Sequence, residues 1–181
     1  FWDYEVAYGN LADQTENADR WHYQIKKPSE GGWIDIPANA LKTKDNGEKS
    51  WTNDDKGLDG TYYYAKLNKD EITSTFQGEA YTAVAYAWKA PKNGYFKMTL
   101  ESPITQASSP APGFFVCHSS DNQDGKDLFR NIVGANSTIT SKIARVHTGE
   151  WLRLGATTKN AWASGLKPVV MEVTAKDYAV Q

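Results

Sequence analysis

Three histidines, one cysteine and scattered carboxylates are the side chains that could do chemistry in this chain of 181 residues. His22, His118 and His147 lack the spacing of a zinc-binding set, and Cys117 has no second cysteine with which to share a metal or form a disulfide. The nucleophile-elbow, phosphate-loop and dinucleotide motifs are absent. The sequence therefore predicts a chain with no catalytic residues, no metal and no cofactor, in which Cys117 packs in the core.

Two glutamates provide the alternative to a non-enzyme. A glycoside hydrolase needs only a pair of carboxylates that flank the scissile bond, and no sequence motif marks such a pair. Glu101 and Glu172 lie at or in segments that alternate apolar and polar residues, so they are the candidates for a compact β-sandwich hydrolase. The solvated outer face of a strand is the other interpretation of both residues, and we favour it.

Two acidic turns, residues 54–60 and 121–127, resemble calcium-binding loops. Clustered carboxylates beside a glycine offer the oxygen ligands that Ca²⁺ takes. Neither turn has the ligand order of the helix-loop-helix calcium motif. We therefore expect plain acidic turns and binding that is independent of added metal, with a structural calcium as the alternative.

Aromatic rings are unusually frequent, with 7 Trp and 10 Tyr against 2 Met at a mean hydropathy of −0.63. Not all of these rings can lie in the core. The C–H face of a sugar stacks on an exposed ring, and its hydroxyls pair with neighbouring amides, carboxylates and basic side chains. The pattern favours carbohydrate binding through exposed rings, for which the candidates are Trp33, Trp51, Tyr62, Tyr64, Trp151 and Trp162.

Strands must position these rings, because apolar and polar residues alternate along most of the chain. Turns rich in Gly, Asn and Asp separate the runs. The best candidate for a helix, residues 68–75, is one or two turns at most. The prediction is an all-β fold, a two-sheet antiparallel β-sandwich of jelly-roll type. The clearest alternating runs are residues 2–8, 21–25, 96–100, 152–154 and 168–173.

The alternation also assigns residues to an outer face. If Leu152 and Leu154 point inward, their neighbours Trp151 and Arg153 point outward.

Length and charge limit the remaining classes. The length favours a single domain, residues 1–181. A net charge of −2 without a cluster of basic residues argues against nucleic acid, and no apolar run is long enough for membrane insertion. The sequence begins at Phe1 without a signal peptide, so we interpret it as part of a larger multidomain protein.

Three segments in order, residues 19–25, 83–98 and 148–170, resemble a module found beside glycoside hydrolases and in cell-surface starch-adherence proteins of polysaccharide-degrading bacteria. The resemblance implies a bacterial β-sandwich carbohydrate-binding module, extracellular or at the cell surface, whose partner is starch or a related α-glucan. It also implies that Trp21, Tyr23 and Trp88, at positions that such modules share, pack in the core. The chain departs from the pattern at Trp151, where such modules usually have a polar residue after the acidic one. It departs again at residues 157–162, which lack the usual acidic residue before the Trp.

A protein-binding adhesion domain is the third class of function. Residues 2–8 would form an aromatic edge strand, and an exposed edge can pair with a partner chain.

Overall fold

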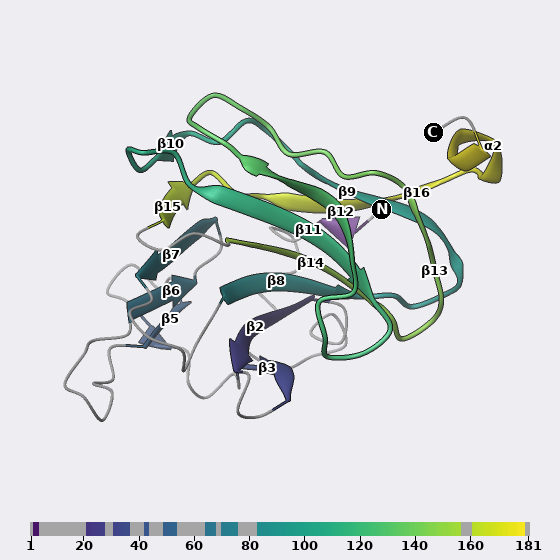
Figure 1. The fold of residues 1–181 in the computed structure, drawn as a ribbon, viewed down its shortest axis with the longest axis horizontal. Helices are drawn as coiled ribbons and strands as arrows, with labels where there is room; N and C mark the ends of the chain where they lie inside the picture. The colour runs from purple at the N-terminus through teal and green to yellow at the C-terminus, as the bar shows by residue number, and fades with distance from the viewer. Residues whose placement is uncertain are drawn as a thin grey trace.

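A computed structural model describes residues 2–3, 21–27, 31–36, 42–43, 49–53, 64–67, 70–75, 83–156 and 161–179. Every strand pair is antiparallel, and the only described helix is one short segment at the C-terminal end (Figure 1). The all-β prediction is confirmed. The elements are β1 (Trp2–Asp3), β2 (Trp21–Lys27), β3 (Gly32–Asp35), β4 (Lys42–Thr43), β5 (Lys49–Asn53), β6 (Tyr64–Leu67), β7 (Glu71–Thr75), β8 (Ala83–Lys89), β9 (Gly94–Leu100), β10 (Gln106–Ala107), β11 (Gly113–Ser119), β12 (Lys126–Ile132), β13 (Ala144–Val146), β14 (Trp151–Ala156), β15 (Ala161–Ser164), β16 (Pro168–Val173) and α2 (Ala175–Ala179).

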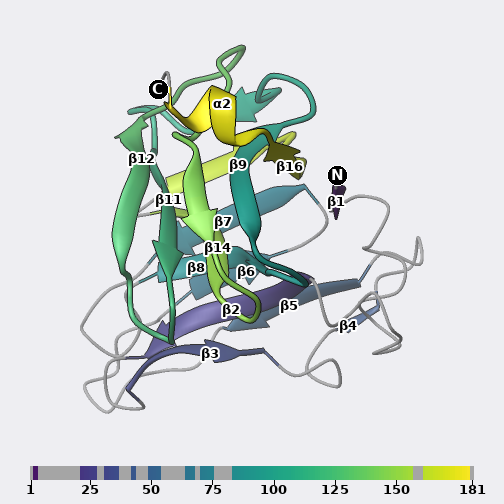
Figure 2. The same cartoon turned by 90° about the vertical axis from the view of Figure 1, so that its right-hand side faces the viewer.

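The strands form a sandwich with a continuous front layer and a divided back layer (Figures 1 and 2). The front sheet has the order β12-β11-β14-β8-β2-β3. Behind it lie the sheets β1-β16-β9-β13 and β10-β15-β7-β6-β5-β4. The chain passes from β15 to β16 through Gly165, whose φ of +82° and close approach to Thr105 exclude a side chain. The sandwich prediction holds, and the break in the back layer at this bend was not foreseen.

The core lies between the layers and contains the rings expected there. Trp21, Tyr23 and Trp88 are all buried, and Trp88 is inaccessible to solvent. Trp88 packs against Phe96 of β9 with ring centroids 5.0 Å apart, which joins the front sheet to the back. Residues of all three sheets share one hydrophobic cluster. The single-domain boundary of residues 1–181 stays a prediction.

Two local predictions need correction. Residues 71–75, part of the expected helix, form the strand β7, which pairs with β6 on one side and β15 on the other. Pairing on both sides, together with the complete burial of Ile72, outweighs a weak local helix preference. The helix that does form, α2, was not predicted, and Thr174 Oγ1 accepts a hydrogen bond from its Asp177 amide at 3.3 Å.

The tryptophan of the edge strand β1 packs against the core. Trp2 pairs with Val170 of β16, and its ring contacts Trp88 and Phe96 at centroid distances of 5.3 and 5.7 Å. The ring proposed as a partner contact therefore packs on the protein itself; residues 4–8 lie outside the described part. No described helix is both long and apolar enough to cross a membrane.

Two substitutions that shorten an aliphatic side chain should distinguish a core position from a surface position. Leu154→Ala removes three buried carbons from a side chain with no solvent exposure, and we expect it to lower the free energy of unfolding by about 2–5 kcal/mol. Ile132→Ala removes as many carbons from a side chain that is 65% exposed and should cost less than about 0.5 kcal/mol. Urea unfolding followed by circular dichroism measures both, and equal costs would contradict the assigned layers.

Candidate functional site

The outer face of the front sheet is built over a floor of small side chains. Strand β8 alternates large residues toward the core with Ala83, Ala85 and Ala87 on the opposite face, and all three alanines are buried. A strand interior lined with methyl groups leaves room above it for larger side chains from neighbouring strands. Those side chains form the candidate site.

Arg153 fills the centre of this face and is 1% exposed, which corrects the expectation that it points into solvent. It does point away from the core, opposite Ala87 in the register, but the protein covers it. Its Nε donates to Gln24 Oε1 at 2.8 Å, and its two terminal nitrogens donate to the backbone carbonyls of Gln123 and Asp121 at 3.1 and 2.9 Å. Burial lowers the pKa of Arg153, but a guanidinium stays charged in proteins.

Residues 119–125, which we call the cover loop, connect β11 to β12 and reach across the sheet to β3. The amide of Trp33 donates to the carbonyl of Asn122 at 2.7 Å, and Gln123 Nε2 donates to the carbonyl of Gly31. At the other end, Gly125 has a φ of +67°, and a Cβ there would lie 2.0 Å from the carbonyl oxygen of His118. The loop therefore joins the two edges of the front sheet.

The carboxylates of the acidic turn at residues 121–127 bind protein donors. Asp121 accepts from the Gln123 amide at 2.8 Å, Asp124 pairs with Lys26, and Asp127 pairs with Arg130 at 2.7 Å. Within the described residues, no three His, Cys, Asp or Glu side chains are arranged to hold a metal ion. The second acidic turn, residues 54–60, lies outside the described part, and metal-independent binding stays a prediction.

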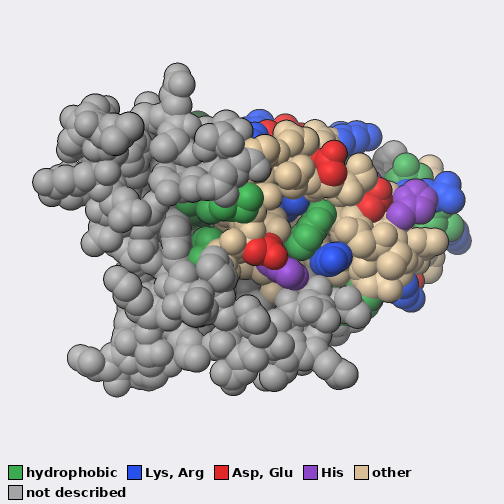
Figure 3. All heavy atoms as spheres, turned by 90° about the horizontal axis from the view of Figure 1, so that it is seen from below, with side chains coloured by type: hydrophobic (Ala, Val, Ile, Leu, Met, Phe, Trp, Pro, Cys, Tyr) green, Lys and Arg blue, Asp and Glu red, His purple; other side chains and the backbone are tan. Residues whose placement is uncertain are grey.

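Trp151 lies beside Arg153 and is partly exposed. The Arg153 guanidinium carbon is 5.2 Å from its ring centroid, the Lys89 ammonium is 5.7 Å away, and His22 meets the ring edge-on at 5.0 Å. We call Trp151, His22, Lys89 and Asp35 the Trp151 patch. Figure 3 shows that the described part of this side carries hydrophobic, acidic, basic and histidine side chains next to one another.

Hydrogen bonds hold the polar part of the patch in place. Asp35 accepts from Gln24 Nε2 at 2.7 Å, and its other oxygen lies 3.0 Å from His22 Nδ1. Burial by itself raises the pKa of Asp35, but the bonds from His22 and Gln24 outweigh burial, so the pKa lies below its ordinary value. Arg153, Gln24, Asp35, His22 and Trp151 thus form a closed set of contacts across β14, β2 and β3.

The other two histidines share one carboxylate at the end of the sandwich. Glu150 Oε1 is 3.0 Å from His118 Nε2 and 3.3 Å from His147 Nδ1, and it accepts the backbone amide of His147 at 2.7 Å. Burial raises the pKa of Glu150, but these hydrogen bonds bring it below the ordinary value. The carboxylate closes the turn before Trp151.

The structure describes three of the six predicted rings and places them apart. Trp151 is partly exposed on the front sheet, and Trp162 is partly exposed on β15 of the back layer, so these two do not form one strip. Trp33 is buried at 3% exposure beneath the cover loop, so it is not an open stacking surface. Trp51 and Tyr64 lie on β5 and β6, but their side chains, and Tyr62 altogether, lie outside the described part.

The two candidate glutamates are too far apart for one glycosidic bond. Glu172 pairs with Phe96, five residues before Glu101 in the chain. At roughly 3.4 Å per residue they are about 17 Å apart along the strands, whereas a glycosidase pair lies within about 10 Å. Glu172 also forms an ion pair with Lys92 at 2.7 Å. The hydrolase alternative fails for this pair.

The sequence matches no protein-family model and has no significant match among curated proteins. Among solved structures, the fold is similar to a family 35 carbohydrate-binding module from Clostridium thermocellum, at 11% identity and a TM-score of 0.36, covering 83% of this chain and 98% of that one. It is also similar to the enzymatically active domain of tailspike protein 4 of bacteriophage CBA120, at 11% identity and a TM-score of 0.36, covering 90% of this chain and 21% of the tailspike. Likeness at this level assigns neither a ligand nor an activity to the chain.

Replacing the buried arginine should release the cover loop. Arg153→Met removes the donor to Gln24 Oε1 and to the Gln123 carbonyl, and one of the two donors to the Asp121 carbonyl, which also accepts from Ser119 Oγ. We expect the free energy of unfolding to fall by at least about 2 kcal/mol. Proteolysis within residues 119–125 should become faster. Arg145→Met, at an exposed position of β13, is the matched control and should change neither measurement. An intact loop in Arg153→Met would show that the arginine does not hold it.

Stability should decline in acid. The pKa values of Asp35 and Glu150 lie below their ordinary values of 3.8 and 4.5, so as the pH falls the unfolded chain takes up protons before the folded one. Their contribution is complete above the ordinary values and is lost as the pH drops through the folded ones. Urea unfolding between pH 7 and pH 3 measures the decline, which should be smaller in Asp35→Asn. Parallel profiles for the two proteins would refute the role of Asp35.

Proposed function

We propose that this chain is a non-catalytic carbohydrate-binding module that binds polysaccharide through the Trp151 patch, with starch or a related α-glucan as the ligand. The observation that carries the proposal is the partly exposed Trp151 ring on a sheet face, fixed from two sides by Arg153 and His22. A tryptophan on an outer face without core packing is what a sugar-stacking site requires. An extracellular or cell-surface location is part of the same proposal.

The neighbours of Trp151 suit the edges of a sugar ring. The Lys89 ammonium can donate hydrogen bonds to sugar hydroxyls. The Asp35 carboxylate is about half exposed and can accept hydrogen bonds from them. Asp35 belongs to the closed set of contacts that includes buried Arg153, and Lys89 lies over the Trp151 ring. Because the groups are already held, binding orders few side chains, and that lowers its entropy cost.

The choice of starch over another polysaccharide rests on the resemblance to starch-adherence modules alone. Stacking on one indole suits many glycans, so the choice of ligand depends on groups around the ring. Trp162 on the back layer offers a second, separate contact of the same kind.

Affinity electrophoresis against a polysaccharide panel tests the proposal. We expect amylopectin to retard the protein, with or without a chelator present, and Trp151→Ala to lose about 1–3 kcal/mol of binding, or roughly 5- to 150-fold in affinity. Ile132→Ala, an exposed site on β12, is the control and should bind normally. Normal retention of Trp151→Ala would place the site elsewhere, and no retention by any glycan would overturn the function.

A further inference from the structure

The second partly exposed tryptophan, Trp162, lies on a different outer face from Trp151. Its neighbour Ala163 and the cross-strand partner Ile72 are completely buried in the core cluster. Successive side chains of a strand point to opposite faces, so Trp162 and its own partner Thr73 point away from the core. Both are partly exposed. The indole therefore lies on the outer face of the back layer.

The described neighbours of this ring are polar. Ser108 lies opposite Trp162, where its amide donates to the Trp162 carbonyl at 2.8 Å and its Oγ accepts from the Trp162 amide at 3.2 Å. Two residues along β15, Ser164 lies between Gln106 of β10 and Glu71 of β7. Neighbours on one sheet face are roughly 5–8 Å apart, so hydroxyl, amide and carboxylate groups lie within reach of a sugar on the indole. We call Trp162, Ser108, Gln106, Ser164, Glu71 and Thr73 the Trp162 patch.

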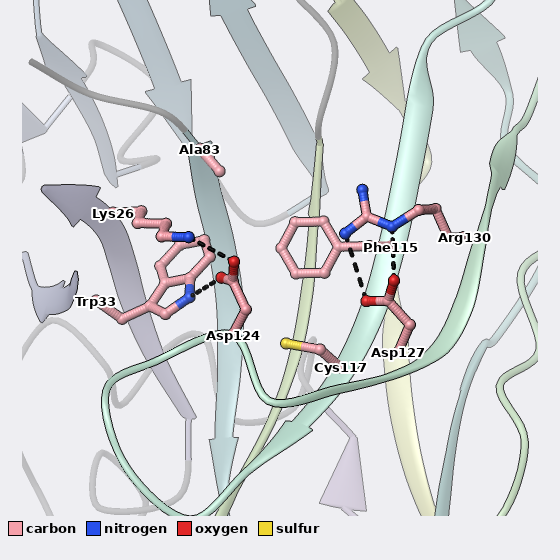
Figure 4. Close-up of a pocket in the computed structure, with 8 residues that line it drawn as sticks. All are labelled: Lys26, Trp33, Ala83, Phe115, Cys117, Asp124, Asp127 and Arg130. Carbon is pink, nitrogen blue, oxygen red and sulfur yellow. Dashed lines mark hydrogen bonds and ion pairs between the residues drawn. The ribbon is translucent and has the colours of Figure 1, made fainter. Parts of the chain in front are cut away.

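The rings beside the cover loop offer no such surface. Trp33 and Phe115 line a pocket there (Figure 4), but they are only 3% and 4% exposed. Each ring already has a guanidinium carbon 5.6 Å from its centroid, from Arg153 and Arg130 respectively. Among the residues that the structure describes, no aromatic or basic side chain packs on Trp162 in this way. The back layer therefore presents an accessible ring, whereas this pocket does not.

The Trp151 patch and the Trp162 patch lie on different layers of the sandwich (Figure 1). Leu152, next to Trp151, and Ala163, next to Trp162, belong to one hydrophobic cluster, which lies between the two patches. Packed sheets are about 10 Å apart, and each ring lies on the outer side of its own sheet. A straight segment of polysaccharide on one face therefore does not reach the ring on the other.

We propose that the Trp162 patch is a second glycan-binding surface, and that the chain uses its two patches to bridge two polysaccharide molecules. The proposal rests on the proposed function for the class of ligand and for the first site. A sugar stacks on Trp162, and the surrounding hydroxyl, amide and carboxylate groups pair with its hydroxyls. A domain with sites on two faces cross-links polymer molecules, whereas a domain with one site only coats them.

Maltoheptaose and amylopectin serve as the two probes. A short oligosaccharide occupies one patch at a time, so the number bound counts the sites, whereas a polymer supplies segments to both. Equilibrium dialysis of the whole chain should give two bound maltoheptaose molecules. The number should fall to one in Trp162→Ala, to one in Trp151→Ala and to none in the double variant. Urea unfolding of each variant shows whether it is folded.

Light scattering measures the bridging itself. The unsubstituted chain should enlarge amylopectin particles, and excess maltoheptaose should reverse the growth. Trp162→Ala and Trp151→Ala should each still be retarded by amylopectin in electrophoresis but should leave the particle size unchanged. Ile132→Ala, which is 65% exposed on β12, is the matched control and should bridge normally.

A second variant of the Trp162 patch leaves the ring in place. Gln106→Ala removes an exposed amide on the edge strand β10 and should weaken binding at the second site by roughly two- to tenfold. This variant tests the patch even if Trp162→Ala does not fold. Unchanged affinity at both sites in folded Gln106→Ala would contradict the assigned surroundings of the ring.

The outcomes separate this proposal from the proposed function. If one maltoheptaose binds, through Trp151, and amylopectin particles do not grow, the bridging proposal is wrong and the proposed function stands. Particle growth that persists in Trp162→Ala, or two bound oligosaccharides without particle growth, would also overturn bridging through this patch. If one maltoheptaose binds and only Trp162→Ala loses it, bridging is wrong and the Trp151 patch is not the site. If neither probe binds, both proposals are wrong.

Discussion

The buried guanidinium of Arg153 is the constraint on which the outer face of the front sheet depends. A charge out of contact with water must find an acceptor for its donors, and Arg153 finds one glutamine oxygen and two backbone carbonyls instead of a direct carboxylate partner. The two carbonyls belong to the cover loop, so the loop has to lie across the sheet for the charge to be solvated by the protein. The acidic residues of the loop add a favourable field around the cation.

This arrangement divides one sheet face into two environments. The Arg153 guanidinium carbon lies 5.6 Å from the Trp33 ring and 5.2 Å from the Trp151 ring, so it supports a covered tryptophan on one side and a partly exposed one on the other. The same side chain thereby contacts both the covered ring of Trp33 and the ring of the Trp151 patch. A displacement of the cover loop would therefore change the surroundings of both tryptophans.

Alternation in the sequence predicted the strands, and the resemblance to carbohydrate-binding modules placed Trp21, Tyr23 and Trp88 in the core, where the structure has them. Alternation could not place Arg153, because it gives the side of the sheet and not what covers that side. The available signal was Ala83-x-Ala85-x-Ala87: small residues on the outer face of a strand indicate that something large lies over them. Likewise, the acidic turn at residues 121–127 resembled a calcium-binding loop because the sequence does not show which cations pair with its carboxylates. Lys26 is distant in sequence, and Arg130 lies on the next strand.

The single cysteine has a consequence of a different kind. Burial raises the pKa of Cys117 to about 12, so at neutral pH its thiolate fraction is on the order of one in 100,000, against a few per cent for an ordinary cysteine. Thiol–disulfide exchange proceeds through the thiolate. Because the sulfur is also buried, at 1% exposure, cross-linking between copies of the chain is disfavoured while the front sheet is intact. The thiol gains ordinary reactivity only when the sheet opens, so alkylation of Cys117 reports unfolding of the face that carries it.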